Sequence, residues 1–259
     1  MSIKCQSTVV RKSSNLLLGI CLAYVLAGCA GPGANHGPND SRLYEQAVSS
    51  PVRSDADRLA DARRKPIEFL EFAGVKPGMR VLDVAAGGGY TTQLLALVAG
   101  NGGVVWAQGA KAQPNLEKRL NDHPQANIVR AVRPFDDPVP DEAAKLDLIT
   151  LILNYHDIAY LPVDRAKMNQ RLFDALKPGG HFVIVDHSAK PGSGTADSKK
   201  LHRIDKATVL AEVRQAGFQL EKSGDFLRNP ADSREKPSFE KDLMSDRFAL
   251  RLVKPSIRP

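Results

Sequence analysis

The amino-acid sequence predicts an α/β domain of three layers, in which a seven-stranded, mostly parallel sheet lies between helices. Two observations carry this prediction. From residue 81 onward, segments with strand character alternate with helical segments, as in chains that build parallel sheets. The last two strand-like segments, Phe218–Phe226 and Arg247–Val253, are separated by mostly polar residues and not by a helix, so we expect them to form an antiparallel C-terminal pair.

The N-terminus has the pattern of an export signal. Three cations and no acids precede or border its apolar run: Lys4, Arg11 and Lys12. The run itself, Leu16–Val25, is too short to cross a membrane comfortably, and it leads into LAGC, which resembles the bacterial lipobox. This resemblance implies that residues 1–28 are a lipoprotein-type signal peptide and that Cys29 carries the lipid. Because Ala30 and not Asp follows, it implies an exported chain anchored in the cell envelope, at the outer membrane facing the periplasm. A plain secretory signal or an uncleaved anchor is the alternative.

Removal of the signal peptide changes the charge and the cysteine count. The formal net charge of +7 falls to +4, because three basic residues and no acids are lost. The remaining chain lacks the strong positive charge of a nucleic-acid-binding protein, so no nucleic-acid partner is predicted. Cys5 and Cys21 leave with the signal, and no thiol is then free for a disulfide, a cysteine metal site or a nucleophile.

The next segments predict a tether and then one domain. Residues 29–51 are rich in Gly, Pro, Asn and Ser, which is typical of a flexible linker. Residues 52–259 are expected to form a single domain that begins with a helical cap. Ser54 followed by Asp57 resembles a capping box at the start of the first helix, and a second helix is expected from Pro66.

The strands and helices of the sheet follow in alternation. Strands are expected at Val81–Val84, Gly103–Ala107, Asn127–Val132, Leu146–Leu153 and His181–Val185. Helices are expected at Tyr90–Val98, Asn115–Asn121, Val163–Leu176 and Asp205–Ala216. The fourth strand (LDLITLIL) is almost wholly apolar, as expected when both faces are covered. In such sheets ligands bind at the carboxyl ends of the strands, near the point where the strand order reverses.

A glycine-rich turn, VLDVAAGGGYTTQLL, follows the first strand. It has no Lys followed by Ser or Thr, so it is not a P-loop for a nucleoside triphosphate. Gly87 and Gly89 could begin the G-x-G-x-x-G turn of a dinucleotide-binding oxidoreductase, but Thr92 stands where the third glycine belongs. Small residues at alternate positions also let a backbone lie against a ligand that has no phosphate.

Asp83, Ala85, Gly87 and Gly89 together resemble the D-x-G-x-G-x-G motif of Rossmann-like, class I S-adenosylmethionine-dependent methyltransferases. LKPGG before the fifth strand and VLAEVRQAGFQLEKS near the end resemble the same family, in the same order, so the resemblance covers roughly residues 53–255. The chain also resembles a bacterial group of predicted methyltransferases that carry signal peptides.

The resemblance implies S-adenosylmethionine as the cofactor. The cofactor-binding residues that it implies are Asp83, Ala85, Gly87, Gly89, Tyr90, Gln108, Asp136 and Asn154. Asp83 would serve the ammonium group, and Asp136, with Asp137 as competitor, the adenine amino group. Two positions depart from the family: Ala85 replaces a glycine, which is tolerable if its φ is negative, and Gln108 replaces the acid that accepts from the ribose hydroxyls.

The segment NYHDI (154–158) holds the candidate catalytic residues. It follows the fourth strand, where the family places the methyl group to be transferred. His156 is predicted to act as a general base, Asp157 to orient it, and Tyr155 to belong to the same catalytic group. The alternative is that His156 and Asp157 only cap the next helix or hold the loop.

More ionisable residues follow later strands. Asp186 and His187 come after the fifth strand, and His202 and Asp205 lie in LHRID. Their spacing is not that of a metal signature, so no metal is predicted, although these residues with NYHDI could hold a divalent ion. Asp205 is well placed as a helix N-cap.

The helical cap is expected to fold over the cofactor mouth. Its arginines either reach a substrate carboxylate or pair with Asp57 and Asp61 on the helix surface. These arginines are Arg53, Arg58, Arg63 and Arg64.

The sequence therefore predicts an S-adenosylmethionine-dependent methyltransferase that acts on a small-molecule substrate. The alternative is an exported lipoprotein that keeps the fold as a non-catalytic ligand-binding module. Gln108 favours this alternative, as does the cytosolic origin of S-adenosylmethionine. A nucleotide-dependent oxidoreductase is a third hypothesis. The methyl acceptor is not readable from the sequence, because loops form its pocket.

Overall fold

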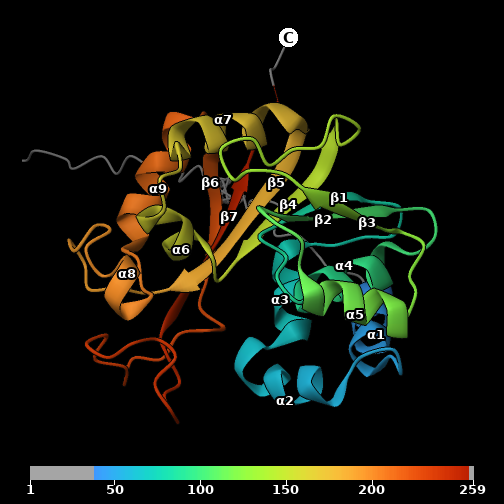
Figure 1. Cartoon of the computed structure of the whole chain (residues 1–259), viewed down its shortest axis with the longest axis horizontal. Helices are drawn as coiled ribbons and strands as arrows, with labels where there is room; N and C mark the ends of the chain where they lie inside the picture. Colours follow the sequence, from blue (N-terminus) through green and yellow to red (C-terminus); the bar gives the residue numbers. More distant parts are fainter. Residues whose placement is uncertain (1–37, 257–259) are drawn as a thin grey trace, which may run out of the picture. The chain divides into compact units, whose positions relative to one another are not determined.

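The computed structural model describes residues 38–256, which form a seven-stranded sheet with helices on both faces (Figure 1). The strands are β1 Arg80–Val84, β2 Val104–Gly109, β3 Ile128–Val132, β4 Leu146–Ile152, β5 Leu176–His187, β6 Gln219–Gly224 and β7 Arg247–Val253. The helices are α1 Pro38–Ser49, α2 Asp55–Arg64, α3 Pro66–Ala73, α4 Tyr90–Ala99, α5 Pro114–Asp122, α6 Tyr155–Tyr160, α7 Arg165–Ala175, α8 Ser198–Leu201 and α9 Lys206–Gln215.

The strand order is β3-β2-β1-β4-β5-β7-β6. Strands β1 to β5 are parallel, and β7 runs antiparallel to both β5 and β6. The prediction of a mostly parallel sheet with an antiparallel C-terminal pair is therefore confirmed. The order reverses between β1 and β4, which makes the carboxyl ends of these two strands the expected ligand-binding edge.

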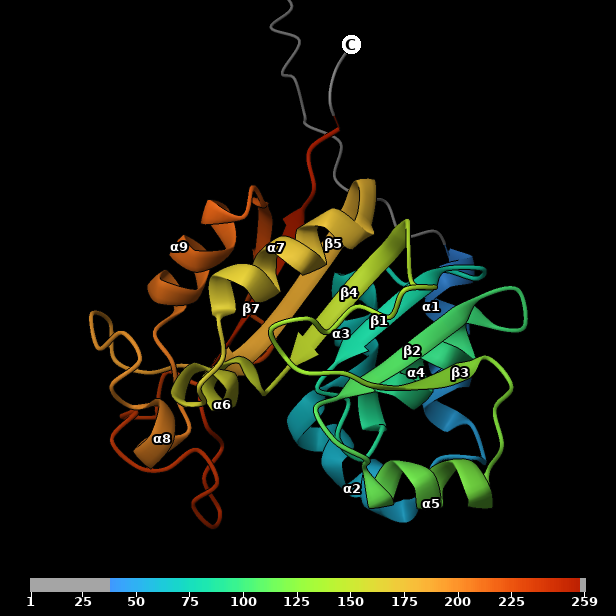
Figure 2. The ribbon, with the colours of Figure 1, turned by 45° about the horizontal axis from the view of Figure 1, so that its top comes forward.

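Two apolar layers cover the sheet, because successive strand residues point to opposite faces. Leu82 points to the face that α6, α7 and α9 cover, whereas Val81 points to the face that α1, α3 and α4 cover. Figure 2 shows these two groups of helices on either side of the strands. Both faces of the central strands are thus buried, as the nearly continuous apolar run of β4 predicts.

The predicted tether to residue 51 is wrong from residue 38 onward. That segment forms α1, whose Tyr44 is fully buried and donates a hydrogen bond from its hydroxyl to Val75 O at 2.9 Å. Tyr44 and Ala47 pack into the same apolar cluster as α3 and α4. The Gly- and Pro-rich composition that suggested a tether belongs mainly to residues before 38. Those residues, Cys29 included, lie outside the described part of the chain.

The strand and helix boundaries otherwise lie close to those predicted, with two differences around β4 and β5. A short helix, α6, starts directly after β4 in the segment NYHDI. The segment KPGG does not separate α7 from β5 but lies inside β5, where the pairing with β4 shifts register beside Leu146. Among residues 38–256, no helix is long and apolar enough to cross a membrane.

Candidate active site

The glycine-rich turn leaves β1 in left-handed backbone conformations. The φ angles of Ala85, Gly87 and Gly89 are +54°, +55° and +81°. A negative φ was the condition for alanine at position 85, and this expectation is wrong, because a left-handed alanine costs about 1–2 kcal/mol. Neighbouring groups hold it there: Ala85 N donates to Gln108 Oε1 at 3.0 Å, and Asn154 Nδ2 donates to Ala85 O at 3.4 Å. The glycine at position 89 is also needed for space, since a Cβ there would lie 2.7 Å from Leu116 Cδ1.

Gln108 is bound to the backbone at both ends of its side chain. Its side chain is fully buried, its Oε1 accepts from Ala85, and its Nε2 donates to Arg133 O at 2.6 Å. Each end of the amide thus has a backbone partner, and the contact to the ribose hydroxyls stays a prediction. Gln108 instead ties the glycine-rich turn to the chain after β3. An acid at this position could not donate to Arg133 O, so the amide suits its actual role.

Asp83 is a buried carboxylate near the end of β1, just before the turn. Its Oδ1 accepts from Thr150 Oγ1 at 2.7 Å, and its Oδ2 accepts from Thr92 Oγ1 at 2.6 Å. Burial raises the pKa of Asp83 to about 6, against the opposing effect of these two hydroxyls. Asp83 lines a cavity of about 280 Å³ at the carboxyl ends of β1 and β4. The cavity is lined by Arg64, Asp83, Ala85, Ala86, Gly87, Gly88, Tyr90, Thr91, Arg119, Ile152, Leu153 and Asn154.

The helical cap closes one side of this cavity, as predicted. Tyr90 donates its hydroxyl to Asp61 Oδ1 at 2.6 Å, and the guanidinium of Arg53 pairs with the same carboxylate at 2.5 Å. Arg64 lies over the Tyr90 ring, with its Cζ 4.6 Å from the ring centroid. Within residues 38–256 no carboxylate lies within 4.0 Å of the Arg64 guanidinium, and burial lowers its pKa. Arg64 is therefore free to bind an anion in the cavity.

The capping box at α2 is confirmed, but its acid has a second partner that the sequence did not suggest. Asp57 closes the box with Ser54 and also forms two hydrogen bonds with Arg119, at 2.6 and 2.8 Å. Arg119 Nε donates to Gly88 O at 2.7 Å. Arg119 thus joins the cap, α5 and the glycine-rich turn, and its position in a mostly polar helix carried no signal of this role.

Asp136 lies away from the cavity. Its carboxylate pairs with Lys167 Nζ at 2.9 Å, and Asp137 pairs with Arg133 and Arg171 at 2.5 and 2.7 Å. Neither acid lines the cavity, so the predicted adenine contact of Asp136 is not supported. The chain after β3 directs both carboxylates toward nearby cations on its own loop and on α7.

Tyr155 is a core residue, and its predicted catalytic role is wrong. Its side chain is fully buried under α7 and α9. Its hydroxyl donates to Glu212 Oε2 at 2.7 Å and accepts from Asn169 Nδ2 at 2.9 Å. As the first residue of α6, it points into the apolar layer and cannot touch a substrate.

His156 is held between two carboxylates. Its Nδ1 lies 2.6 Å from Asp186 Oδ1, and its Nε2 lies 3.2 Å from Asp157 Oδ1. Burial lowers the pKa of His156, but the two carboxylates outweigh burial and raise this pKa to about 9. The two carboxylates therefore favour the protonated imidazole, whereas a general base needs the neutral form, and the role of His156 as a general base stays a prediction. Asp157 contacts His156 as predicted.

The later His/Asp pairs also gather at this edge. His202 Nδ1 lies 2.9 Å from Asp157 Oδ1, and the rings of His156 and His187 lie 5.6 Å apart. Asp205 does not join them: it is the N-cap of α9, as predicted, and accepts from Ala207 N at 2.9 Å.

Two more spaces lie beside the Asp83 cavity: a narrow apolar gap and, next to the gap, a second cavity. A narrow apolar gap adjoins the Asp83 cavity and shares Arg64, Ile152 and Leu153 with it. Arg247 and Leu227 line both this gap and the second cavity, whose volume is about 260 Å³. The second cavity is lined by Arg63, Lys65, Phe226, Leu227, Arg228, Asn229, Met244, Ser245 and Arg247.

Arg247 is an uncompensated cation in this second cavity. Burial, Arg64 and Arg63 lower its pKa to about 10. Its Nη1 donates to Arg63 O at 2.6 Å, while its buried Nε has no hydrogen-bond partner among the described residues. The sequence carried no signal for Arg247, because it lies in the last strand, far along the chain from the glycine-rich turn.

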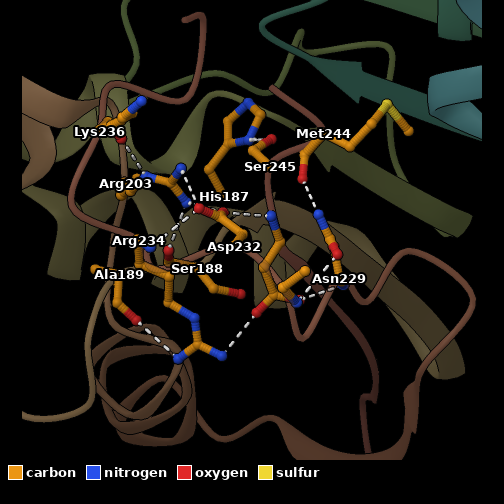
Figure 3. A network of polar contacts seen from close by, with 12 residues as sticks. His187, Ser188, Ala189, Arg203, Asn229, Asp232, Arg234, Lys236, Met244 and Ser245 are labelled. Carbon is orange, nitrogen blue, oxygen red and sulfur yellow. Dashed lines mark hydrogen bonds and ion pairs between the residues drawn. The ribbon is translucent and has the colours of Figure 1, made fainter. Parts of the chain in front are cut away.

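The loop before β7, which forms one wall of the second cavity, is held by a buried ion pair. Arg203 and Asp232 are both almost fully buried, and Arg203 Nη1 lies 2.8 Å from Asp232 Oδ2. Figure 3 shows this pair within a network of polar contacts. Asp232 Oδ2 also accepts from Asp246 N at 2.6 Å. His187 Nδ1 lies 2.8 Å from Ser245 Oγ, and both residues belong to the network in Figure 3. These contacts join Ser245 and Asp246 to His187 and to the buried ion pair.

The comparisons with known proteins agree with this architecture. No protein-family model matches the chain. It is 31% identical over 121 residues to the ubiquinone/menaquinone biosynthesis C-methyltransferase of Proteus mirabilis, covering 46% of this chain and 47% of that protein. It is 28% identical over 166 residues to the protein of the same name from Azotobacter vinelandii, covering 63% and 62%. The chain thus spans about half the length of the curated relatives it matches first.

Two solved structures share the fold. An S-adenosylmethionine-dependent methyltransferase from Aquifex aeolicus has a TM-score of 0.55 at 18% identity, over 82% of this chain and 97% of that one. Another from Mesorhizobium loti has a TM-score of 0.52 at 18% identity, over 69% and 92%. The fold is therefore the Rossmann-like fold of class I S-adenosylmethionine-dependent methyltransferases.

Proposed function

We propose that this chain, with its class I methyltransferase fold, transfers the methyl group of S-adenosylmethionine to a small-molecule acceptor. The observation that carries the proposal is the buried carboxylate of Asp83, which faces a cavity at the point where the strand order reverses. A buried carboxylate without a cation partner is costly, and a ligand ammonium group relieves that cost. The named curated relatives are C-methyltransferases, which agrees with the reaction class.

The residues present fit the amino-acid end of this cofactor. Asp83 would accept from its ammonium group, and Arg64 would bind its carboxylate, since both line the same cavity. The left-handed turn at Ala85 and Gly87 would lie against the rest of the molecule, since little side-chain bulk stands in the way.

Alignment supplies much of the rate in methyl transfer. The bound cofactor supplies an electrophilic methyl group on a sulfonium, and the chain must hold the acceptor in line with it. Ile152 and Leu153 line both the cofactor cavity and the apolar gap, so they would exclude water from the point of transfer. The acceptor would lie in the gap and in the second cavity beyond it.

The second cavity favours an anionic acceptor. Arg64 and Arg247 line the gap, and neither guanidinium has a carboxylate within 4.0 Å among the described residues. Burial and the positive charges of Arg64 and Arg63 lower the pKa of Arg247, so this cation lies among like charges. A carboxylate or phenolate on the acceptor would relieve this repulsion and orient the molecule.

Calorimetry with S-adenosylmethionine tests the proposal. The wild-type chain is expected to bind it, and Asp83→Asn to lose most of that affinity. Asp141→Asn, the same change at an exposed aspartate, is expected to bind as the wild type does. No binding to the wild type would refute the methyltransferase assignment. Binding without methyl transfer to any of a panel of carboxylates and phenols would support the non-catalytic ligand-binding module instead.

We also propose that the chain is exported and lipid-anchored through Cys29. The support is the cationic start, the apolar run Leu16–Val25 and the LAGC segment, all in the part of the chain that the structure does not describe. Metabolic labelling with radioactive palmitate should label the wild type and not Cys29→Ser. A Cys29→Ser chain that still carries label would refute anchoring through this residue.

A further inference from the structure

We propose that His156, Asp157 and His202 bind a divalent transition-metal ion through two imidazole nitrogens and one carboxylate oxygen. One donor atom of each residue lies within 4.8 Å of the other two. Asp157 Oδ1 lies 3.2 Å from His156 Nε2 and 2.9 Å from His202 Nδ1. A tetrahedral zinc ion with bonds of about 2.0 Å separates its ligand atoms by about 3.3 Å, so small side-chain rotations would complete the site.

The orientation of His156 is the one that metal-binding histidines have. Asp186 Oδ1 lies 2.6 Å from Nδ1, and Asp186 Oδ2 accepts from the backbone N–H of His156 at 2.9 Å. A carboxylate that accepts a hydrogen bond from one ring N–H fixes the tautomer in which the other nitrogen has a lone pair, which is the common arrangement around protein-bound zinc. Asp186 is fully buried and therefore holds the ring in one position.

Asp157 offers an oxygen that the protein does not satisfy. Its Oδ1 is buried from solvent and accepts no hydrogen bond from residues 38–256, although two imidazole nitrogens lie within 3.2 Å. A buried carboxylate oxygen without a donor is costly. A cation between this oxygen and the two nitrogens would satisfy all three atoms together.

The chain on both sides of the third ligand, His202, is held by contacts with other segments. His202 follows α8 with a φ of +51°, and the next residue is the buried Arg203 that Asp232 anchors (Figure 3). Ser238 N donates to Leu201 O at 2.8 Å, so the chain on the other side of His202 is also held. The side chain of His202 remains about one-third exposed, which leaves the ion reachable from solvent.

The ligand set selects the kind of ion. Two imidazoles and one carboxylate, without a thiolate, suit Zn²⁺, Co²⁺ or Fe²⁺ better than Mg²⁺ or Ca²⁺, which prefer all-oxygen sites. Three protein ligands leave at least one position open for water or for a small ligand. This inference does not depend on S-adenosylmethionine binding, because every donor lies outside the cofactor cavity.

Metal binding by the full chain, without cofactor or substrate, tests the proposal. After dialysis against a chelator, the wild type is expected to bind one equivalent of Zn²⁺ in calorimetry and to give Co²⁺ the visible absorption of a protein-bound ion. His202→Ala and Asp157→Asn are expected to lower the affinity for Zn²⁺ more than tenfold. His123→Ala, which removes an exposed histidine elsewhere, is expected to bind as the wild type does.

Circular dichroism shows whether each variant is folded, and Asp157→Asn keeps the size of the side chain if His202→Ala does not fold. A wild type without stoichiometric Zn²⁺ or Co²⁺ binding would overturn the proposal. So would a folded Asp157→Asn chain with wild-type affinity, because the ion would then lie elsewhere.

Discussion

Replacing Asp83 by asparagine should make the ligand-free fold more stable at neutral pH while it removes cofactor binding. Burial raises the pKa of Asp83 from 3.8 to about 6. Above pH 6 this carboxylate is ionised in both the folded and the unfolded chain, so the folded state bears the full cost of a buried charge. Below about pH 4 it is protonated in both states and the cost disappears. The stability of the wild type therefore falls relative to the variant as pH rises between these values.

The size of the effect follows from the shift. About two pKa units correspond to roughly 3 kcal/mol at neutral pH, at about 1.4 kcal/mol per unit. Asparagine keeps one acceptor and gains donors, so the hydroxyls of Thr92 and Thr150 can still be paired. The difference in unfolding free energy between Asp83→Asn and the wild type should grow by about 2 kcal/mol from pH 4.5 to pH 7.5.

Urea denaturation of the ligand-free proteins at these two pH values measures the difference. Asp141→Asn, at an exposed position, should show no comparable change with pH. A difference between Asp83→Asn and the wild type that is the same at both pH values would refute the reasoning, because an ionised buried carboxylate is its only source.

Three more outcomes are expected. The affinity of the wild type for S-adenosylmethionine should fall as pH drops below about 6, because Asp83 becomes protonated there, and calorimetry across this range measures the loss. Gln108→Glu should destabilise the fold by about 1–3 kcal/mol in urea denaturation, because a buried acid cannot donate to Arg133 O. Asp232→Asn should cost about 3–5 kcal/mol in the same assay, because it leaves the buried Arg203 unpaired.

The two substitutions have matched comparisons. Gln113→Glu makes the same change as Gln108→Glu at a more exposed amide and should stay within about 0.5 kcal/mol of the wild type. Glu235→Gln breaks an exposed ion pair on the same loop as Asp232 and should cost less than about 1 kcal/mol. Tighter cofactor binding by Gln108→Glu, without loss of stability, would mean that position 108 reaches the ligand after all. A Kd for S-adenosylmethionine that stays constant down to pH 5 would separate Asp83 from cofactor binding.

The part of the candidate site whose residues are close together in the sequence was predictable. Asp83 and the small residues after it lie within seven positions, so a strand followed by a glycine-rich turn places them together whatever the rest of the fold does. Gln108 and Asp136 were predicted only from their places at strand ends. The direction of each side chain depends on a partner elsewhere, Arg133 O for one and Lys167 for the other, and those partners turn both away from the cavity.

The charges that surround His156, the predicted base, could not be predicted from the sequence for a related reason. An isolated His156 would titrate near neutral pH, and nothing in NYHDI reveals that Asp186, thirty residues later, lies against its other nitrogen. The pKa of a histidine is set by the charges around it in space. The same distant contact that favours the protonated form of His156 also orients its ring as that of a metal ligand.

Periodicity, capping residues and turn glycines were enough to establish the order and kind of the elements, because these signals act over a few residues. They established the parallel sheet, the antiparallel closing pair, the capping box at α2 and the small-residue turn after β1. Only the packed structure brought Arg247 beside Arg64, and His202 beside Asp157. These pairs join residues far apart in the chain, and the order of strands in a sheet follows from the burial of all its faces together, which no local pattern encodes.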